Sequence, residues 1–162
     1  MRILNKIFIP DEIFIISSCY CKVTASSITA QNWLETIPND RPALIIAEGV
    51  FEYLSKEEVK TFLHWLTNYF SHGQIAFDVM NPSSVDLKQE QLKKTTGATI
   101  RWTVDSISEV DKLNSKLKRI EIVPLFKSIF IKQLPFRLRF IFGLLTLFPK
   151  YKNGMRLLRY DF

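Results

Sequence analysis

Two carboxylates that follow predicted strands are the side chains best placed to do chemistry. Residues 43–47 (ALIIA) form a continuous apolar run, which is typical of a strand buried on both faces. Glu48 follows this run directly, and Asp78 lies at the end of the next predicted strand, residues 74–79. Open α/β sheets bind ligands at the carboxyl ends of their strands. We therefore expect Glu48 to act in a site there or, alternatively, only to cap the turn, while Asp78 faces either the cleft or away from it.

Metal and thiol chemistry have little support in the sequence. Cys19 and Cys21 would point to the same face of a strand, a geometry that does not suit a disulfide between them. The only histidines, His64 and His72, lack the spacing of zinc ligands, and we expect His64 to lie at the surface. We expect no metal and two free thiols in a reducing cytoplasm. The apolar N-terminal run is interrupted at Pro10, so a signal peptide is not predicted.

The net positive charge of the chain does not by itself indicate a nucleic-acid partner. The net charge is +6, and much of the excess lies after residue 112, spread among apolar residues. No helix-turn-helix, zinc-finger or RNP pattern is present, so we expect a solvated basic surface and no nucleic-acid partner. Residues 134–148 predict an apolar helix that is too short to span a bilayer. We expect this helix to be buried or to cap the core; the alternative is a helix resting on an anionic membrane surface.

The elements that would position Glu48 and Asp78 alternate between strands and helices. Ser55 and Glu58 have the spacing of a capping box at the start of a helix that ends at His72-Gly73. The unit of residues 43–79 therefore predicts a parallel strand–helix–strand crossover. Tyr53, just before the helix, either lines the pocket or packs beneath the helix. The remaining expected elements are a strand at 20–25, a polar helix at 86–94, a capped helix from Ser106, and strands at 117–125 and 155–162.

Three motifs resemble the leucine carboxyl methyltransferase-like family, which includes O-methyltransferases of bacterial polyketide biosynthesis. The first is Ala-Glu-Gly followed by Tyr-Leu at residues 47–54, and the second is the run GATIRWTVD at residues 97–105. The third is Arg156, Arg159, Tyr160 and Phe162 at the end of the chain. Ser27 and Trp33 also match a segment that lies near the cofactor's adenine in the family. Ala30 stands where that segment usually has Asp, and we expect Trp33 to anchor the core.

The resemblance implies a fold, a cofactor and a reaction. It implies a class I, Rossmann-like α/β sheet with strand order 3-2-1-4-5-7-6. The reaction would be methyl transfer from S-adenosylmethionine to a carboxylate or hydroxyl of a small-molecule acceptor. A carboxylate acceptor needs no general base, whereas a phenol would benefit from one. By resemblance Glu48 would pair with the ammonium of the cofactor's methionine part, and Ala30 would lack the carboxylate that meets its adenine end. Which residue would be catalytic is not evident.

The family's Gly-rich cofactor turn is absent from the sequence. No two of the five glycines form G-x-G, and no strand carries the acid that would bind the ribose. We therefore interpret residues 1–162 as one domain that lacks the first two strands and starts in mid-helix. This would leave the strand at residues 43–47 as an open, aggregation-prone edge, unless the N-terminal strands rearrange to fill the gap.

Three hypotheses about function follow. The chain is an O-methyltransferase-family domain; or a non-catalytic remnant or split-enzyme half that does not bind cofactor alone; or a binding module. A split half would pair with an N-terminal-half polypeptide or with itself through the open sheet edge. A binding module would use that same edge or would rest on a membrane through residues 134–148. We expect the membrane contact least.

Overall fold

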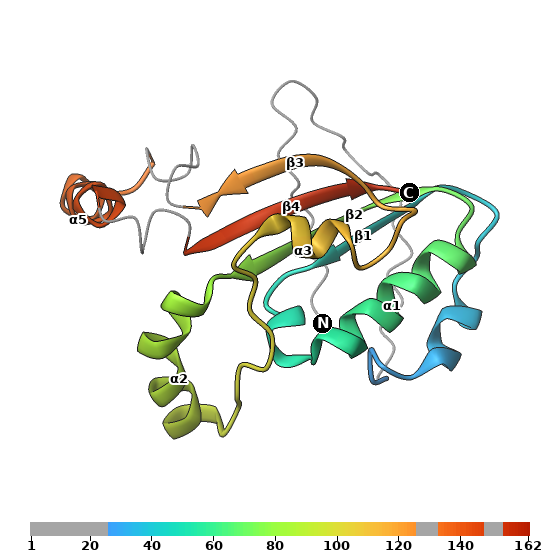
Figure 1. Cartoon of the computed structure of the whole chain (residues 1–162), viewed down its shortest axis with the longest axis horizontal. Helices are drawn as coiled ribbons and strands as arrows, with labels where there is room; N and C mark the ends of the chain where they lie inside the picture. The colour runs from blue at the N-terminus through green and yellow to red at the C-terminus, as the bar shows by residue number, and fades with distance from the viewer. Residues whose placement is uncertain (1–25, 126–132, 148–153) are drawn as a thin grey trace.

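The chain folds around one mixed β-sheet (Figure 1). The computed structural model describes residues 26–125, 133–147 and 154–162. Its four strands are β1 (Ala43–Ala47), β2 (Gly73–Met80), β3 (Lys118–Pro124) and β4 (Met155–Asp161), in the order β1-β2-β4-β3. β1 and β2 are parallel, and β4 runs antiparallel to both β2 and β3. This order corresponds to strands 4-5-7-6 of the predicted sheet, so the predicted fold class is confirmed.

The helices begin where local capping signals place them. α1 (Lys56–Tyr69) begins after Ser55 with the predicted capping box. α2 (Pro82–Thr96) begins after Asn81, whose side chain accepts from the Ser84 amide at 2.9 Å, and ends at Gly97 in the left-handed region. The shorter elements are η1 (Gln31–Thr36), η2 (Phe51–Tyr53) and α3 (Ile107–Asp111), and α5 (Phe136–Leu147) precedes β4.

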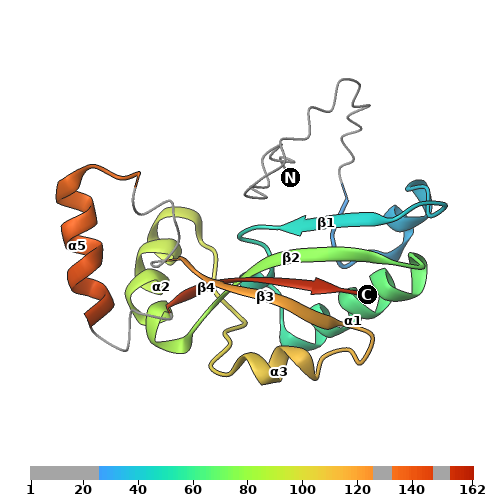
Figure 2. The ribbon, with the colours of Figure 1, turned by 90° about the horizontal axis from the view of Figure 1, so that it is seen from above.

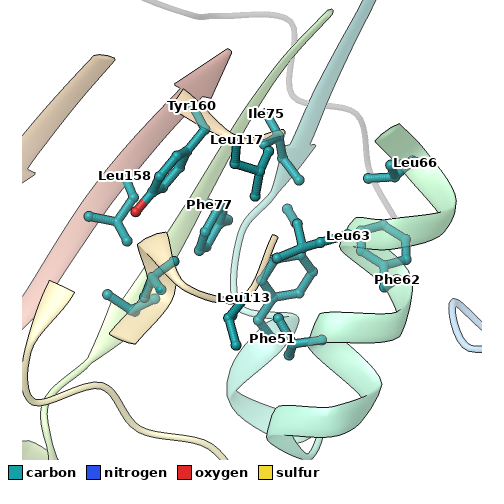
Figure 3. Packing of buried hydrophobic residues seen from close by; sticks show 14 of the residues in the cluster. Phe51, Phe62, Leu63, Leu66, Ile75, Phe77, Leu113, Leu117, Leu158 and Tyr160 are labelled. Carbon is teal, nitrogen blue, oxygen red and sulfur yellow. The ribbon is translucent and has the colours of Figure 1, made fainter. Parts of the chain in front are cut away.

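A core of apolar side chains joins α1 and the α3 region to one face of the sheet (Figure 3). The helix α1 buries one apolar face, formed by Val59, Phe62, Leu63, Leu66 and Phe70, and Tyr69 packs against this core. Phe77 lies parallel to Tyr160, with ring centroids 5.8 Å apart. The Tyr160 hydroxyl donates to Asp111 at 2.8 Å, which fixes the end of α3 over β4. Burial and this carboxylate raise the pKa of Tyr160 well above its usual range.

Three expectations about these elements are wrong or shifted. β1 is not buried on both faces: Leu44 is 59% exposed, because no helix in the described part covers that face of the strand. The α5 helix is neither buried nor a cap, and Phe136 at its start is 76% exposed. His72-Gly73 does not end α1, which stops at Tyr69; Gly73 already pairs with Ala43 and is the first residue of β2. A Cβ at Gly73 would meet the Ala43 carbonyl oxygen, which explains the glycine.

Other expectations are confirmed or fall outside the described residues. β1 is the edge of the sheet in the part of the chain that the structure describes, as predicted. The strand expected at residues 117–125 is β3, whose pairing with β4 shifts register between Arg119 and Glu121. The expected strand at 20–25, the helical start at Met1 and the two cysteines lie outside the described residues.

Candidate functional site

The turn after β1 carries the first predicted site residue. Glu48 is exposed, and its carboxylate has no hydrogen bond or ion pair to any residue that the structure describes. Gly49 follows with φ +61°, a left-handed conformation that favours glycine. The Gly49 amide donates to the Asp78 carboxylate at 2.8 Å. A residue near the end of β2 therefore stabilises the turn after β1. Through this hydrogen bond, Asp78 lies at the same turn as Glu48.

Asp78 occupies an interior position on β2. Its residue is 3% exposed, and it lies on the face opposite Phe77, since successive strand residues point to opposite faces. One of its oxygens accepts the Gly49 hydrogen bond. A buried carboxylate needs such donors because it has left water. Asp78 thus stabilises the turn, and its contact with a ligand stays a prediction.

Glu52 is a buried carboxylate that the sequence analysis did not identify. It lies in η2, is 8% exposed, and its Oε2 atom has no hydrogen-bond partner in the described part of the chain. Its backbone carbonyl accepts from the Arg101 amide at 2.8 Å, which ties η2 to the segment after α2. A buried carboxylate oxygen without a partner is costly, and such groups in native proteins call for an explanation. A ligand that brings a donor or a positive charge would supply one.

Tyr53 lies beside these carboxylates. Burial raises its pKa, and the nearby negative charges of Glu52 and Asp78 raise it further. Tyr53 therefore stays protonated at neutral pH and is a donor there, not a general base. We call Glu48, Gly49, Glu52, Tyr53 and Asp78 the acidic turn. Its three carboxylates supply negative charge and acceptor atoms, which suit a cationic or hydrogen-donating ligand.

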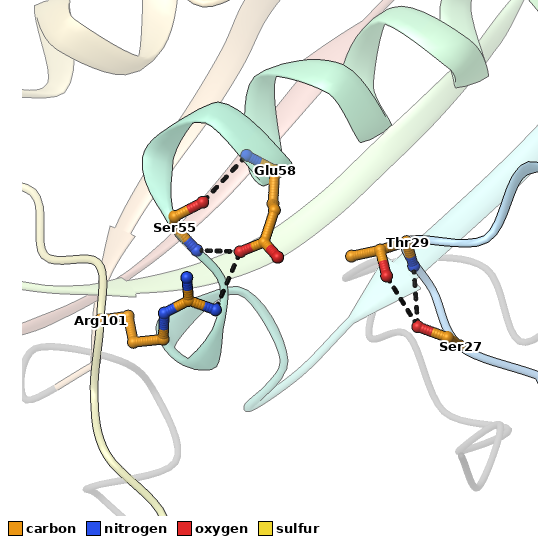
Figure 4. Close-up of polar contacts among 5 residues, drawn as sticks. All are labelled: Ser27, Thr29, Ser55, Glu58 and Arg101. Carbon is orange, nitrogen blue, oxygen red and sulfur yellow. Dashed lines mark hydrogen bonds and ion pairs between the residues drawn. The ribbon is translucent and has the colours of Figure 1, made fainter.

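The capping box of α1 fixes the far side of the acidic turn (Figure 4). The Ser55 amide donates to Glu58 at 2.6 Å, and the Glu58 amide donates to the Ser55 hydroxyl at 3.3 Å. Arg101 forms an ion pair with the same Glu58 oxygen at 3.0 Å. Arg101 thus contacts this region twice, through its amide and its guanidinium. No local sequence pattern signals this pairing, because the two residues are far apart in the chain.

Ala30 lies just before η1 and Trp33 lies within it, and both precede the acidic turn in the sequence. Ala30 is the residue before η1 and is partly exposed. The Trp33 indole donates to the Ile28 carbonyl at 3.3 Å and stacks on Phe62, with centroids 6.1 Å apart. In the turn before Ala30, the Ser27 hydroxyl oxygen accepts from the Thr29 amide at 3.3 Å and lies 2.8 Å from the Thr29 hydroxyl (Figure 4). Trp33 packs against the core, as predicted, and the cofactor role of this segment stays a prediction.

Other surveyed features do not add to the site. A shallow hollow at the amino ends of β1 and β2, lined by residues that include Leu44, His72 and Phe162, lies at the opposite end of β1 from Glu48. His64 is exposed, as expected. Among the described residues, no three His, Cys, Asp or Glu side chains gather as metal ligands. Nor does any helix in those residues have the length and apolar character needed to cross a membrane.

Two curated proteins are similar to this chain in sequence. The tetracenomycin polyketide synthesis O-methyltransferase TcmP of Streptomyces glaucescens is 28% identical over 160 residues, which cover 95% of this chain and 59% of that protein. The S-adenosyl-L-methionine-dependent methyltransferase dpfgK of Gibberella zeae is 30% identical over 99 residues, which cover 56% of this chain and 33% of that protein. The chain matches no protein-family model.

A solved structure is similar in fold. It is a candidate methyltransferase from Thermobifida fusca YX, with a TM-score of 0.54 and 11% identity, covering 83% of this chain and 51% of the other. At this identity the likeness concerns the fold alone. The chain spans about half the length of the proteins it matches.

Proposed function

We propose that this chain, a relative of S-adenosylmethionine-dependent O-methyltransferases, serves methyl transfer from S-adenosylmethionine to an oxygen of a small molecule in the cytoplasm. The sequence likeness to TcmP extends over 95% of the chain, and it supports the resemblance seen in the motifs. The single observation that carries the proposal is the acidic turn at the carboxyl ends of β1 and β2. Parallel strands of open α/β sheets present their ligand sites at this end.

The residues of the acidic turn fit the positively charged end of that cofactor. Glu48 presents an exposed carboxylate without a described partner, which can pair with an ammonium group. The partnerless Oε2 of Glu52 can accept a hydrogen bond from a bound group. Gly49 has no described atom near the place of a Cβ, so the backbone is open to close approach. In the reaction, the residues of this chain would bind the cofactor and orient the acceptor.

The cofactor supplies a methyl group already activated on a sulfonium, which leaves as a neutral thioether after transfer. The residues then need only hold an acceptor oxygen in line with that methyl group. A carboxylate acceptor is ionised at neutral pH and needs no base. A hydroxyl acceptor would benefit from one, and Glu52 is the carboxylate of the acidic turn that is both buried and unpaired at Oε2. Tyr53, with its raised pKa, would donate a hydrogen bond to the acceptor.

Calorimetric titration of the folded, monodisperse chain with S-adenosylmethionine tests the proposal. We expect binding that is lost in Glu48→Ala. The matched control is Glu90→Gln, which removes an exposed carboxylate on α2, away from the acidic turn. Binding that is equal in both variants would contradict the role of Glu48. A folded chain that does not bind would contradict cofactor binding by this polypeptide.

A second candidate is a binding role through the open edge of β1, alone or as one half of a split enzyme. Two observations favour this binding role. β1 pairs only with β2 in the described part of the sheet, and Leu44 on β1 is 59% exposed. Unpaired strand edges recruit further strands. Sedimentation velocity over a range of concentrations measures self-pairing. A dimer that grows with concentration supports it, and a monomer throughout contradicts it.

A further inference from the structure

The α5 helix exposes apolar side chains that no described element covers. Phe136 is 76% exposed and Leu147 is 74% exposed, and Phe140 and Leu144 are also exposed. In Figures 1 and 2 the helix lies at one end of the molecule, apart from the sheet. Aromatic and aliphatic side chains exposed together mark an interaction surface. This surface is separate from the acidic turn and needs no assumption about methyl transfer.

Four of the five exposed apolar side chains of α5 form a stripe bordered by positive charge, and the fifth, Leu138, lies on the opposite side of the helix. At about 100° per residue, Phe136, Phe140, Leu144 and Leu147 fall within an arc of about 80° on the helix. Arg137 and Arg139 flank this arc on its two sides, and both are exposed. Arg139 also lines a shallow hollow with Phe136, Phe140 and Leu144. Long basic side chains beside an apolar stripe can lie along it while their charges stay in water or among headgroups.

In the sequence, the net positive charge of the chain falls within the segment that contains this helix. Residues 127–152 hold six basic residues and no acidic one. The remaining 16 basic residues equal the 16 acidic ones, so the net charge of +6 lies entirely within this range. The six are Lys127, Lys132, Arg137, Arg139, Lys150 and Lys152. The other nearby cations are already engaged, since Arg156 donates to the Asp105 carbonyl and Arg159 pairs with Glu121.

We propose that α5 lies in the surface of an anionic membrane, with its apolar stripe among the acyl chains and Arg137 and Arg139 at the phosphates. A helix of 12 residues is about 18 Å long, well short of the ~30 Å hydrocarbon core, so it lies in the interface and does not cross it. Basic residues beside an apolar stripe are the features of such interfacial helices. A second copy of the chain fits less well, because it would bring four arginines together.

Co-sedimentation with lipid vesicles tests this proposal on the full chain. We expect binding to phosphatidylcholine vesicles that contain phosphatidylserine, little binding to phosphatidylcholine alone, and a loss of binding as salt is raised. The double variant Arg137→Gln/Arg139→Gln should weaken binding by at least about tenfold, because each cation near an anionic surface contributes several-fold. Phe140→Asp should abolish it, since a charge would enter the apolar stripe.

The matched control is Lys56→Gln/Lys60→Gln, which removes the same charge from exposed positions on α1. It should bind as the unchanged chain does. Circular dichroism and urea unfolding check that each variant is folded, which we expect because the changed side chains are exposed. No binding to anionic vesicles would overturn the proposal, as would equal losses in the two double variants. A dimer without lipid that Phe140→Asp abolishes would overturn it in favour of a second copy.

Discussion

Glu58 shows how one side chain can link two parts of the chain. Its carboxylate accepts from the Ser55 amide at 2.6 Å and forms an ion pair with Arg101 at 3.0 Å. The hydrogen bond from Ser55 is the main cause that lowers the pKa of Glu58, and the Arg101 charge lowers it further. The ionised form therefore stabilises both the start of α1 and its contact with residue 101.

This depressed pKa predicts a pH-dependent stability. The contribution of Glu58 is complete above the ordinary glutamate pKa of about 4.3 and is lost as the pH falls through the lower pKa of the folded state. We expect Glu58→Gln to be less stable than the unchanged chain at neutral pH, and the difference in stability to be smaller near pH 3, because Glu58 loses its charge as the pH falls. Urea unfolding at the two pH values measures the difference.

Glu57→Gln is the control for this measurement, since it removes an exposed carboxylate from the same turn of α1 without those contacts. The difference in unfolding free energy between Glu57→Gln and the unchanged chain should vary less with pH. A Glu58→Gln difference that stays the same at both pH values would show that its cause is lost packing and not the carboxylate charge.

At the residue scale, the sequence predicted local pairs and missed distant ones. The Ser55–Glu58 capping box could be predicted because both residues lie within one turn. The Arg101–Glu58 pair could not, because the fold alone brings residue 101 to α1. Glu52 was missed since a single acid in an apolar run gives no signal that its Oε2 is buried without a partner. The roles of Glu48, Tyr53, Asp78 and Ala30 stay predictions.

The turn between β1 and η2 depends on a contact from the neighbouring strand. Gly49 adopts φ +61°, and its amide donates to Asp78 on β2 at 2.8 Å. We expect Asp78→Ala to lower the free energy of unfolding by about 1–3 kcal/mol, because the Gly49 amide loses its acceptor. Asp78→Asn keeps an oxygen acceptor and should cost less. Urea unfolding of the three proteins measures both effects.

Two further outcomes would decide the Asp78 prediction. If Asn cost as much as Ala, the negative charge and not the acceptor atom would hold the turn. If neither substitution changed stability, the Gly49 contact would be dispensable. In either variant the pKa of Tyr53 should fall toward its ordinary value, since the Asp78 charge helps to raise it.

At the element scale, strands and capped helices were predictable and their surroundings were not. The strand at 43–47 was predicted with its exact bounds from five apolar residues. The burial of that strand was overestimated, because apolar composition does not reveal which neighbours are present; Leu44 is the example. The same reasoning failed for α5, whose apolar sequence indicated burial although Phe136 and Leu147 are exposed.

At the scale of the whole molecule, the two faces of the sheet differ. One face carries α1 and the α3 region, with Ile75, Phe77 and Tyr160 buried beneath them (Figure 3). At the other face, the described part of β1 leaves Leu44 exposed, and β1 has an unpaired edge. The acidic turn lies at the end of this same edge strand. Any strand added to β1 would therefore come next to Glu48 and change the surroundings of the proposed site.

Leu44→Lys tests whether the β1 edge associates with other chains. A lysine on an exposed edge strand opposes further strand pairing, because added strands would bring its charge against apolar side chains. We expect little change in unfolding free energy, within about 0.5 kcal/mol, since the side chain is already 59% exposed. Any concentration-dependent dimer should weaken. The control is Gln74→Lys, which places the same charge on the residue paired with Leu44 on the interior strand β2. Sedimentation velocity that shows equal dimer loss in both variants would point to net charge as the cause, whereas loss in Leu44→Lys alone would identify β1 as the interface.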